Sequence, residues 1–275
     1  MGKTSVAVFN TQPPHLYFGG VERRIMETSS RLSGEIDFTV FSGTKEGFHK
    51  SVIVDGVKIA PCKSTDILFP LDNWTFNHTL KKTATQFRAD IYESHNVSGY
   101  GLQKVLQKQY AKTQFITTVH GVLADEYARA QHGGRASARG KLANFFMKQL
   151  AKIEGESARN ASLVVTISNY SSQKIVELYG VDKAKIRIVP NGVDPRKFLP
   201  NGNCVKTKER IGAGNKAIVL FVGRLIPRKG LLRLLEAARR IVGERSETLF
   251  VIVGDGPLRS QIVNEVNNSG LANNF

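Results

Sequence analysis

The sequence predicts an α/β fold with parallel sheets, divided into two domains. Short apolar, β-rich runs alternate with amphipathic helical segments along the whole chain, which is typical of parallel α/β architecture. The alternation restarts after an Asn-Gly pair between two prolines at residues 190–195, and such a segment ends any regular element. A chain of 275 residues is long enough for two domains of ordinary size. We therefore expect a first domain at residues 1–194 and a second at 195–275.

The first domain is expected to open with a strand at Ser5–Phe9 and a loop rich in Pro and Gly that leads into a helix at Val21–Leu32. Apolar or small side chains at helical spacing (Ile25, Ser29, Leu32) mark the buried face of that helix. Further strands are expected at Asp37–Phe41, Asp90–Ser94, Gln114–Val119, Leu163–Ile167 and Ile186–Val189, and further helices at Phe76–Phe87, Tyr100–Ala111, Lys141–Arg159 and Ser171–Tyr179. Residues 42–77 show no clear pattern, and residues 132–140 form a basic loop.

The second domain repeats the pattern in a shorter form. Strands are expected at Ala217–Val222 and Leu249–Val253, and helices at Leu231–Val242 and from about Leu258. A doubly wound domain usually has five or six strands, so either the second domain is very small or it is incomplete in this chain.

Composition limits the possible classes of protein. The content is 41% hydrophobic and 23% charged, which is ordinary for a globular protein, and no apolar run approaches the roughly 20 residues of a membrane span. With two cysteines the chain has no disulfide framework, so a reducing, cytoplasmic location is expected. The net charge of +16 requires an explanation, and nucleic acid, an anionic membrane face and phosphate-bearing small molecules are the candidates.

Loops at the carboxyl ends of the strands are where an open α/β sheet binds its ligands. Gly19 and Gly20 follow the first strand and open a helix, where backbone can approach a ligand closely and the helix N-terminus favours an anion. His120 ends another strand and is followed by glycine. A plain turn and a structural histidine are the alternative interpretations of these two features.

The loop Gly223–Gly230 is the most informative, because Arg224, Arg228 and Lys229 lie between a strand and a helix start. Arginine can bind phosphate through two parallel hydrogen bonds, and lysine adds a point charge. The next strand ends in Gly254-Asp-Gly256, and in a parallel sheet that loop is expected beside the first, with room for a ligand ring or phosphate.

Taken together, seven segments resemble the family 4 glycosyltransferases, the retaining enzymes of the GT-B fold. They occur in the family's order and cover almost the whole chain. The segments are Gly19–Glu22, Asp90–His95, Thr117–Gly121, Val165–Ser168, Ile188–Asp194, Phe221–Gly230 and Val253–Leu258.

The resemblance implies two Rossmann-like domains and transfer of a sugar from a nucleotide sugar, such as a UDP- or GDP-sugar, to a glycan, lipid or small-molecule acceptor with retention. It assigns the donor diphosphate to Arg224 and Lys229, which act catalytically with His120 beside the transferred sugar. It also implies which glycines bind phosphate and which residues contact the acceptor or form the hinge. It implies no metal or other cofactor. The glycines are Gly19, Gly20, Gly254 and Gly256, and the acceptor or hinge residues are Glu22, His95, Asn191 and Asp194.

The sequence departs from the family in two places. The pair of glutamates that contacts donor sugar and ribose is absent, which suggests an N-terminal portion of such an enzyme, and Glu93 stands where many relatives have histidine. A non-catalytic paralogue that binds nucleotide phosphate or a partner chain is therefore the alternative function.

A basic cluster lies outside the phosphate loop, and it has few interleaved aromatic residues and no nucleic-acid motif. An anionic membrane or a lipid-phosphate acceptor is therefore the expected partner, with peripheral contact on the inner membrane face, and nucleic acid is not. The cluster is formed by Arg129, Arg135, Arg139, Lys141, Lys148 and Lys152.

Overall fold

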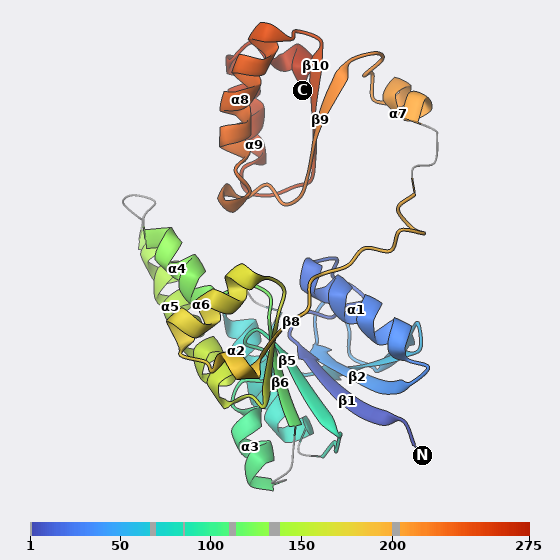
Figure 1. Cartoon of the computed structure of the whole chain (residues 1–275), viewed down its shortest axis with the longest axis vertical. Coiled ribbons are helices and arrows are strands. Elements are labelled where there is room, and N and C mark those ends of the chain that lie inside the picture. Colours follow the sequence, from blue (N-terminus) through green and yellow to red (C-terminus); the bar gives the residue numbers. More distant parts are fainter. Residues whose placement is uncertain (1, 67–69, 85, 110–113, 132–137, 200–203) are drawn as a thin grey trace. The chain divides into compact units, whose positions relative to one another are not determined.

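The computed structural model describes residues 2–66, 70–84, 86–109, 114–131, 138–199 and 204–275, which form two compact units (Figure 1). Unit 1 spans Met1–Gly192 and unit 2 spans Val193–Phe275. The division falls within the proline-flanked segment that the sequence singles out.

Unit 1 alternates strands and helices. Its strands are β1 (Thr4–Asn10), β2 (Ile36–Gly43), β3 (Val52–Val54), β4 (Val57–Cys62), β5 (Ile91–His95), β6 (Gln114–Val119), β7 (Leu163–Thr166) and β8 (Ile186–Ile188). Its α-helices are α1 (Gly20–Leu32), α2 (Leu71–Ala84), α3 (Leu102–Gln109), α4 (Leu123–Gln131), α5 (Ala138–Asn160) and α6 (Asn169–Tyr179).

The strands form one sheet in the order β3-β4-β2-β1-β5-β6-β7-β8. All neighbours pair in parallel except β3 with β4. The chain builds outward from β1 through β2 and β4, and then returns to add β5 on the other side of β1. The ends of β1 and β5 therefore form the topological switch point, where doubly wound sheets bind ligands.

Alternating side chains of β1 place apolar residues on both faces of the sheet. On one face Ala7 and Phe9 pack with Phe76 and Leu80 of α2 and with α3. On the opposite face Val6 and Val8 pack with Ile25 of α1. The sheet is therefore buried between helical layers, which leaves the strand-end loops free to carry function.

Unit 2 contains a parallel pair of strands, β9 (Ala217–Val222) and β10 (Thr248–Val253), among its described residues. Helices α8 (Leu231–Glu244) and α9 (Arg259–Asn268) lie along this pair (Figure 1), and their apolar faces share one core with Phe250. Leu220 and Val222 of β9 are exposed. A short helix, α7 (Cys204–Arg210), precedes the strands.

Most predicted elements are confirmed, with shifts of a few residues at their ends. The unassigned stretch 42–77 contains β3, β4 and the first half of α2, and helices α4 and α7 were missed. The expectation that Leu32 lies on the buried face of α1 is wrong, because it sits in the last turn and is exposed. Residues 132–137 of the expected basic loop lie outside the described residues, and 138–140 begin α5.

Candidate active site

The glycine pair lies in the loop after β1, at the start of α1. Gly19 is the N-cap of the helix and its extended backbone offers no capping side chain, so the amide donors of the first turn are not used by a cap. A Cβ on Gly19 would collide with the buried carboxylate of Glu22, whereas one on Gly20 would meet nothing within 4 Å. A side chain at Gly19 would therefore displace the Glu22 carboxylate, which accepts a hydrogen bond from Asn10 Nδ2 at 3.2 Å.

Two histidines meet at the carboxyl ends of β5 and β6. His95 Nδ1 lies 2.8 Å from His120 Nε2, and the two rings stack at 5.1 Å. Burial lowers the pKa of both imidazoles to about 3, with the positive charge of Arg24 contributing. Both rings are therefore neutral at physiological pH, and each can act as a hydrogen-bonding group but not as a cation.

The half-buried carboxylate of Glu93 lies beside His95. It accepts a hydrogen bond from Thr118 Oγ1 at 2.6 Å and lies 3.5 Å from His95 Nε2. Burial raises the pKa of Glu93. A carboxylate on the Nε2 side favours the tautomer of His95 with its hydrogen there, so that Nδ1 accepts from His120 and the Nδ1 of His120 carries a free lone pair.

Arg24 of α1 is a site residue that sequence reasoning missed. Its guanidinium donates hydrogen bonds to Val189 O at 2.9 Å and to Asn191 Oδ1 at 2.8 Å. These bonds join α1 to the segment after β8, and the charge influences the pKa of both histidines. The only sequence signal is a cation one turn after the glycine pair, which does not distinguish it from neighbouring Arg23.

In unit 2 the loops after β9 and β10 lie side by side, as predicted. Leu225 N donates to Asp255 O at 2.8 Å, and Leu258 N donates to Leu225 O at 3.0 Å. A Cβ on Gly254 would collide with the Gly223 carbonyl, and one on Gly256 would lie 2.6 Å from Leu225 O. These glycines were expected to leave room for a ligand, and in the structure the neighbouring loop occupies the positions where their Cβ atoms would lie.

Arg224 and Lys229 are exposed on the β9 loop, and within the described part of the chain neither side chain makes a hydrogen bond or ion pair, although the backbone of both is hydrogen-bonded to Ile226. Lys229 ends a short 3-10 turn that Gly230 closes at φ +73°. Gly230 is also the N-cap of α8 and provides no capping side chain. Lys229 therefore directly precedes an uncapped helix N-terminus, and Arg224 lies on the same loop, an arrangement suited to binding a diphosphate.

The predicted site residues thus fall into two groups, one in each unit. Unit 1 brings Gly19, Gly20, Glu22, His95, His120 and Asn191 to the carboxyl edge of its sheet, from β1, β5, β6 and the segment after β8. Unit 2 holds Arg224, Lys229, Gly254 and Gly256, and also Asp194, whose Oδ1 accepts from Arg196 N at 2.9 Å. The roles assigned to these residues stay predictions.

Two family models match the chain, in sequence order. The model described as Glycosyltransferase Family 4 matches residues 18–197, and the model described as Glycosyl transferases group 1 matches residues 206–275. The chain belongs to glycosyltransferase family 4. The family resemblance expected from the sequence is thereby confirmed.

Curated relatives of this family 4 chain include enzymes with different acceptors. It is 28% identical over 188 residues to an Escherichia coli UDP-Gal:α-D-GlcNAc-diphosphoundecaprenol α-1,3-galactosyltransferase, covering 67% of this chain and 45% of the relative. It is 31% identical over 142 residues to a GDP-mannose-dependent α-(1-6)-phosphatidylinositol monomannoside mannosyltransferase of Mycolicibacterium smegmatis, covering 50% and 36%. The chain spans about half the length, or less, of these two curated relatives.

Solved structures show the same fold. Anabaena HepE in complex with UDP and glucose matches with a TM-score of 0.70 and 15% identity, over 98% of this chain and 68% of HepE. WaaG, a glycosyltransferase involved in lipopolysaccharide biosynthesis, matches with a TM-score of 0.72 and 17% identity, over 98% and 68%. The predicted GT-B class, with two Rossmann-like α/β units, is therefore confirmed.

Proposed function

We propose that this chain carries the donor- and acceptor-binding residues of a retaining glycosyltransferase that uses a nucleotide sugar. The observation that carries the proposal is the pair of free cations, Arg224 and Lys229, on the loop that leads to the uncapped N-terminus of α8. When the sugar leaves, the nucleoside diphosphate gains negative charge, and preorganised cations stabilise that state more than the ground state. The presence of UDP or GDP donors in the names of relatives and structural neighbours supports this choice.

In unit 1 we assign the binding of the transferred sugar to the pair His95 and His120. The neutral His120, held by His95, offers an acceptor nitrogen to a sugar hydroxyl, and Glu93 maintains the tautomer. The uncapped turn at Gly19 and Gly20 is assigned to phosphate or acceptor. The donor site is proposed to need no metal or other cofactor, because Arg224 and Lys229 supply the positive charge.

The acceptor is proposed to be lipid-linked, with peripheral contact between unit 1 and an anionic membrane on its cytoplasmic side. Of the basic cluster, Lys141, Lys148 and Lys152 are exposed on α5, while Arg129 pairs with Asp125 at 3.1 Å. Arg135 lies outside the described residues. Within the described part of the chain no helix is long and apolar enough to cross a bilayer.

Calorimetric titration with UDP, GDP and ADP tests the donor site. We expect one of them to bind, and we expect R224A/K229A to weaken binding about 100-fold or more, since each charge-assisted hydrogen bond contributes about 1.5–3 kcal/mol. The double variant K206A/R210A removes two exposed cations from α7 of the same unit and is expected to bind normally. Undiminished binding in R224A/K229A would place the diphosphate elsewhere, and no binding of any nucleotide would favour a non-catalytic paralogue that binds a partner chain.

A further inference from the structure

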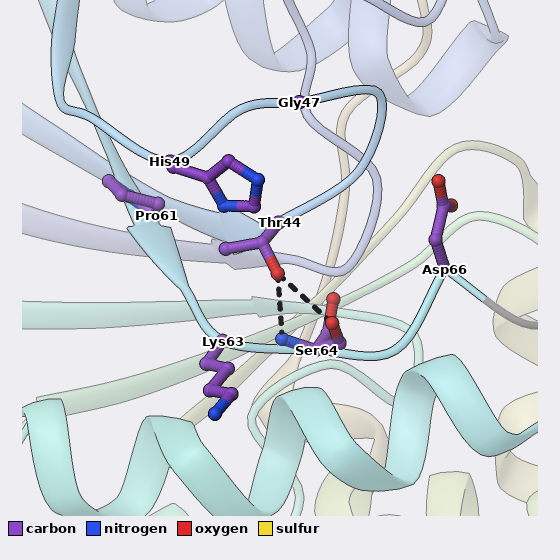
Figure 2. A pocket seen from close by; sticks show the side chains of 7 residues that line it. All are labelled: Thr44, Gly47, His49, Pro61, Lys63, Ser64 and Asp66. Carbon is purple, nitrogen blue, oxygen red and sulfur yellow. Dashed lines mark hydrogen bonds between the residues drawn. The ribbon is translucent and has the colours of Figure 1, made fainter.

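A pocket of about 560 Å³ opens at the carboxyl ends of β2 and β4, on the edge of the sheet that carries the candidate site. Its lining is mixed, with slightly more apolar than polar surface, and we call it the polar pocket because hydroxyl and carboxylate groups reach it. Its lining includes Thr44, Ser64 and Asp66 (Figure 2). Thr44 Oγ1 donates to Ser64 O and accepts from Ser64 N, both at 3.0 Å, which holds the two loops together. The Ser64 hydroxyl has no hydrogen-bond partner among the described residues. Such a lining of hydroxyls and a carboxylate suits a polyhydroxylated ligand.

A second pocket of about 470 Å³ adjoins the first, because Lys63 and Ser64 line both. The wall of this second pocket is mostly carbon, with Trp74 of α2 as its largest side chain. Lys63 is exposed, and Figure 2 shows its side chain extending away from His49 and Thr44. A cation therefore stands at the boundary between a polar and an apolar pocket.

The apolar pocket continues into an aromatic patch, which we define as Trp74, Leu142, Phe145 and Phe146. The rings of Trp74 and Phe146 lie 6.0 Å apart, and those of Phe145 and Phe146 lie 5.7 Å apart. Trp74 is 46% exposed, Leu142 57% and Phe145 56%. Large apolar side chains gathered in this way mark a surface that contacts another apolar phase.

Positive charge accompanies the aromatic patch along α5. Lys141, Phe145, Lys148 and Lys152 follow each other at spacings of three or four residues, so they share one face of the helix, and all four are exposed. An apolar stripe beside exposed lysines complements an anionic lipid surface.

The walls of the two pockets are held in place by buried polar contacts. Lys45 and Asp72 form a buried ion pair at 2.5 Å that joins the loop after β2 to the first turn of α2. Thr65 N donates to Thr75 Oγ1 at 2.9 Å, which joins the loop after β4 to the same helix. The arrangement is therefore preorganised for a ligand.

We propose that the two pockets and the aromatic patch together form the binding site of a lipid-linked phosphosugar acceptor, and we call this binding site the seat. The sugar occupies the polar pocket, the phosphate binds Lys63, and the hydrocarbon chain covers the apolar pocket and the aromatic patch. This inference rests on the proposed function, since it names the acceptor class of the same enzyme.

Vesicle flotation of the full chain tests the seat, with polyprenyl phosphate as the probe. Three kinds of vesicle are compared. The first contains phosphatidylcholine alone, the second also contains polyprenyl phosphate, and the third instead contains phosphatidylglycerol in the amount that gives the same surface charge as the second. The chain is expected to bind the polyprenyl phosphate vesicles at least tenfold more tightly than either of the others. K63A and F145S are each expected to reduce that binding at least fivefold.

Matched controls come from the same unit. K58A removes an exposed lysine of β4, and I53S removes an exposed apolar side chain of β3. Both are expected to bind as the unchanged chain does. Any of three results would overturn the seat. The chain could bind phosphatidylglycerol vesicles as tightly as polyprenyl phosphate vesicles, K63A and F145S could leave binding to polyprenyl phosphate vesicles unchanged, or the chain could fail to bind those vesicles.

Nucleotide calorimetry separates this result from the donor proposal. Binding of polyprenyl phosphate through Lys63 and Phe145 without binding of any nucleoside diphosphate would retain the seat and reject the donor site. The reverse pattern would retain the glycosyltransferase proposal and reject the seat.

Discussion

Glycine at positions 254 and 256 lets two backbones approach each other in unit 2. The β10 loop runs against the β9 loop that carries Arg224, and a Cβ at either glycine would enter the space of Gly223 or Leu225. Backbone hydrogen bonds join the two loops: Gly223 N donates to Val253 O, Leu225 N to Asp255 O, and Leu258 N to Leu225 O. A methyl group there must therefore displace backbone, which costs more than moving a flexible side chain.

We expect G256A to destabilise unit 2 by about 2 kcal/mol or more. G243A is the control, because Gly243 lies in α8 with nothing within 4 Å of its Cβ position. Alanine is a better helix former than glycine, so G243A is expected to stabilise the unit by up to about 1 kcal/mol. Urea unfolding followed by circular dichroism measures both, and equal effects of the two substitutions would contradict the packing argument.

At the scale of elements, Glu154 of α5 joins three helices of unit 1. Its Oε2 accepts from Leu123 N at the start of α4 at 2.9 Å and from the Tyr179 hydroxyl of α6 at 2.5 Å. The side chain is fully buried, and burial raises the pKa of Glu154 to about 7, which the charge of Glu126 reinforces. This helix junction is therefore sensitive to pH.

The direction in which folding stability changes with pH follows from proton linkage. In the folded state Glu154 keeps its proton up to about pH 7, whereas in the unfolded chain it loses the proton near its ordinary value of 4.5. The free energy of unfolding that the raised pKa of Glu154 contributes is fully present below pH 4.5. It is lost as pH rises to 7, by about 1.4 kcal/mol per pH unit. Relative to E154Q, the unchanged chain should therefore lose about 2–3 kcal/mol between pH 5 and 7.

Urea unfolding of the two proteins across this pH range measures the difference. E35Q, at an exposed position of unit 1, controls for the loss of one carboxylate. A stability gap between E154Q and the unchanged chain that stays constant from pH 5 to 7 would show that Glu154 is ionised throughout.

At the scale of the molecule, the two units differ in the size of their cores. Among the described residues, unit 1 buries three apolar clusters around an eight-stranded sheet, whereas unit 2 has one cluster on a strand pair that leaves Leu220 and Val222 exposed. Stability rises with the apolar area buried, so unit 2 should be the weaker. The cores share no residues, which permits separate unfolding.

We expect two unfolding steps in urea by circular dichroism. The chain has a single tryptophan, Trp74, in unit 1, so its fluorescence should follow only the second step. A nucleoside diphosphate that binds at Arg224 and Lys229 should shift the first step alone. Coincident single transitions by both probes would mean that the units unfold together.

Much of this fold could be predicted because local patterns decided it. Strands β6 and β9 have the predicted bounds, since a short apolar run between turn residues has few alternatives. The elements within residues 42–77 were not predicted, for two reasons. Strand β3 has only three residues. The buried residues of α2 include Asp72, Asn73 and Asn77, which interrupt the apolar pattern expected of a buried helix face. Those polar residues are satisfied by partners elsewhere in the chain, for example Lys45 for Asp72.

The sequence by itself determined the family, the parallel α/β class and the strand-end positions of Gly19, His120, Arg224 and Lys229. These depend on order along the chain and on residue chemistry, which a sequence contains. Only the tertiary structure paired His95 with His120, placed Glu93 and Arg24 around them, and set Gly254 against the neighbouring loop. Such contacts arise between segments distant in sequence, where the sheet order and the packing of helices decide which side chains meet.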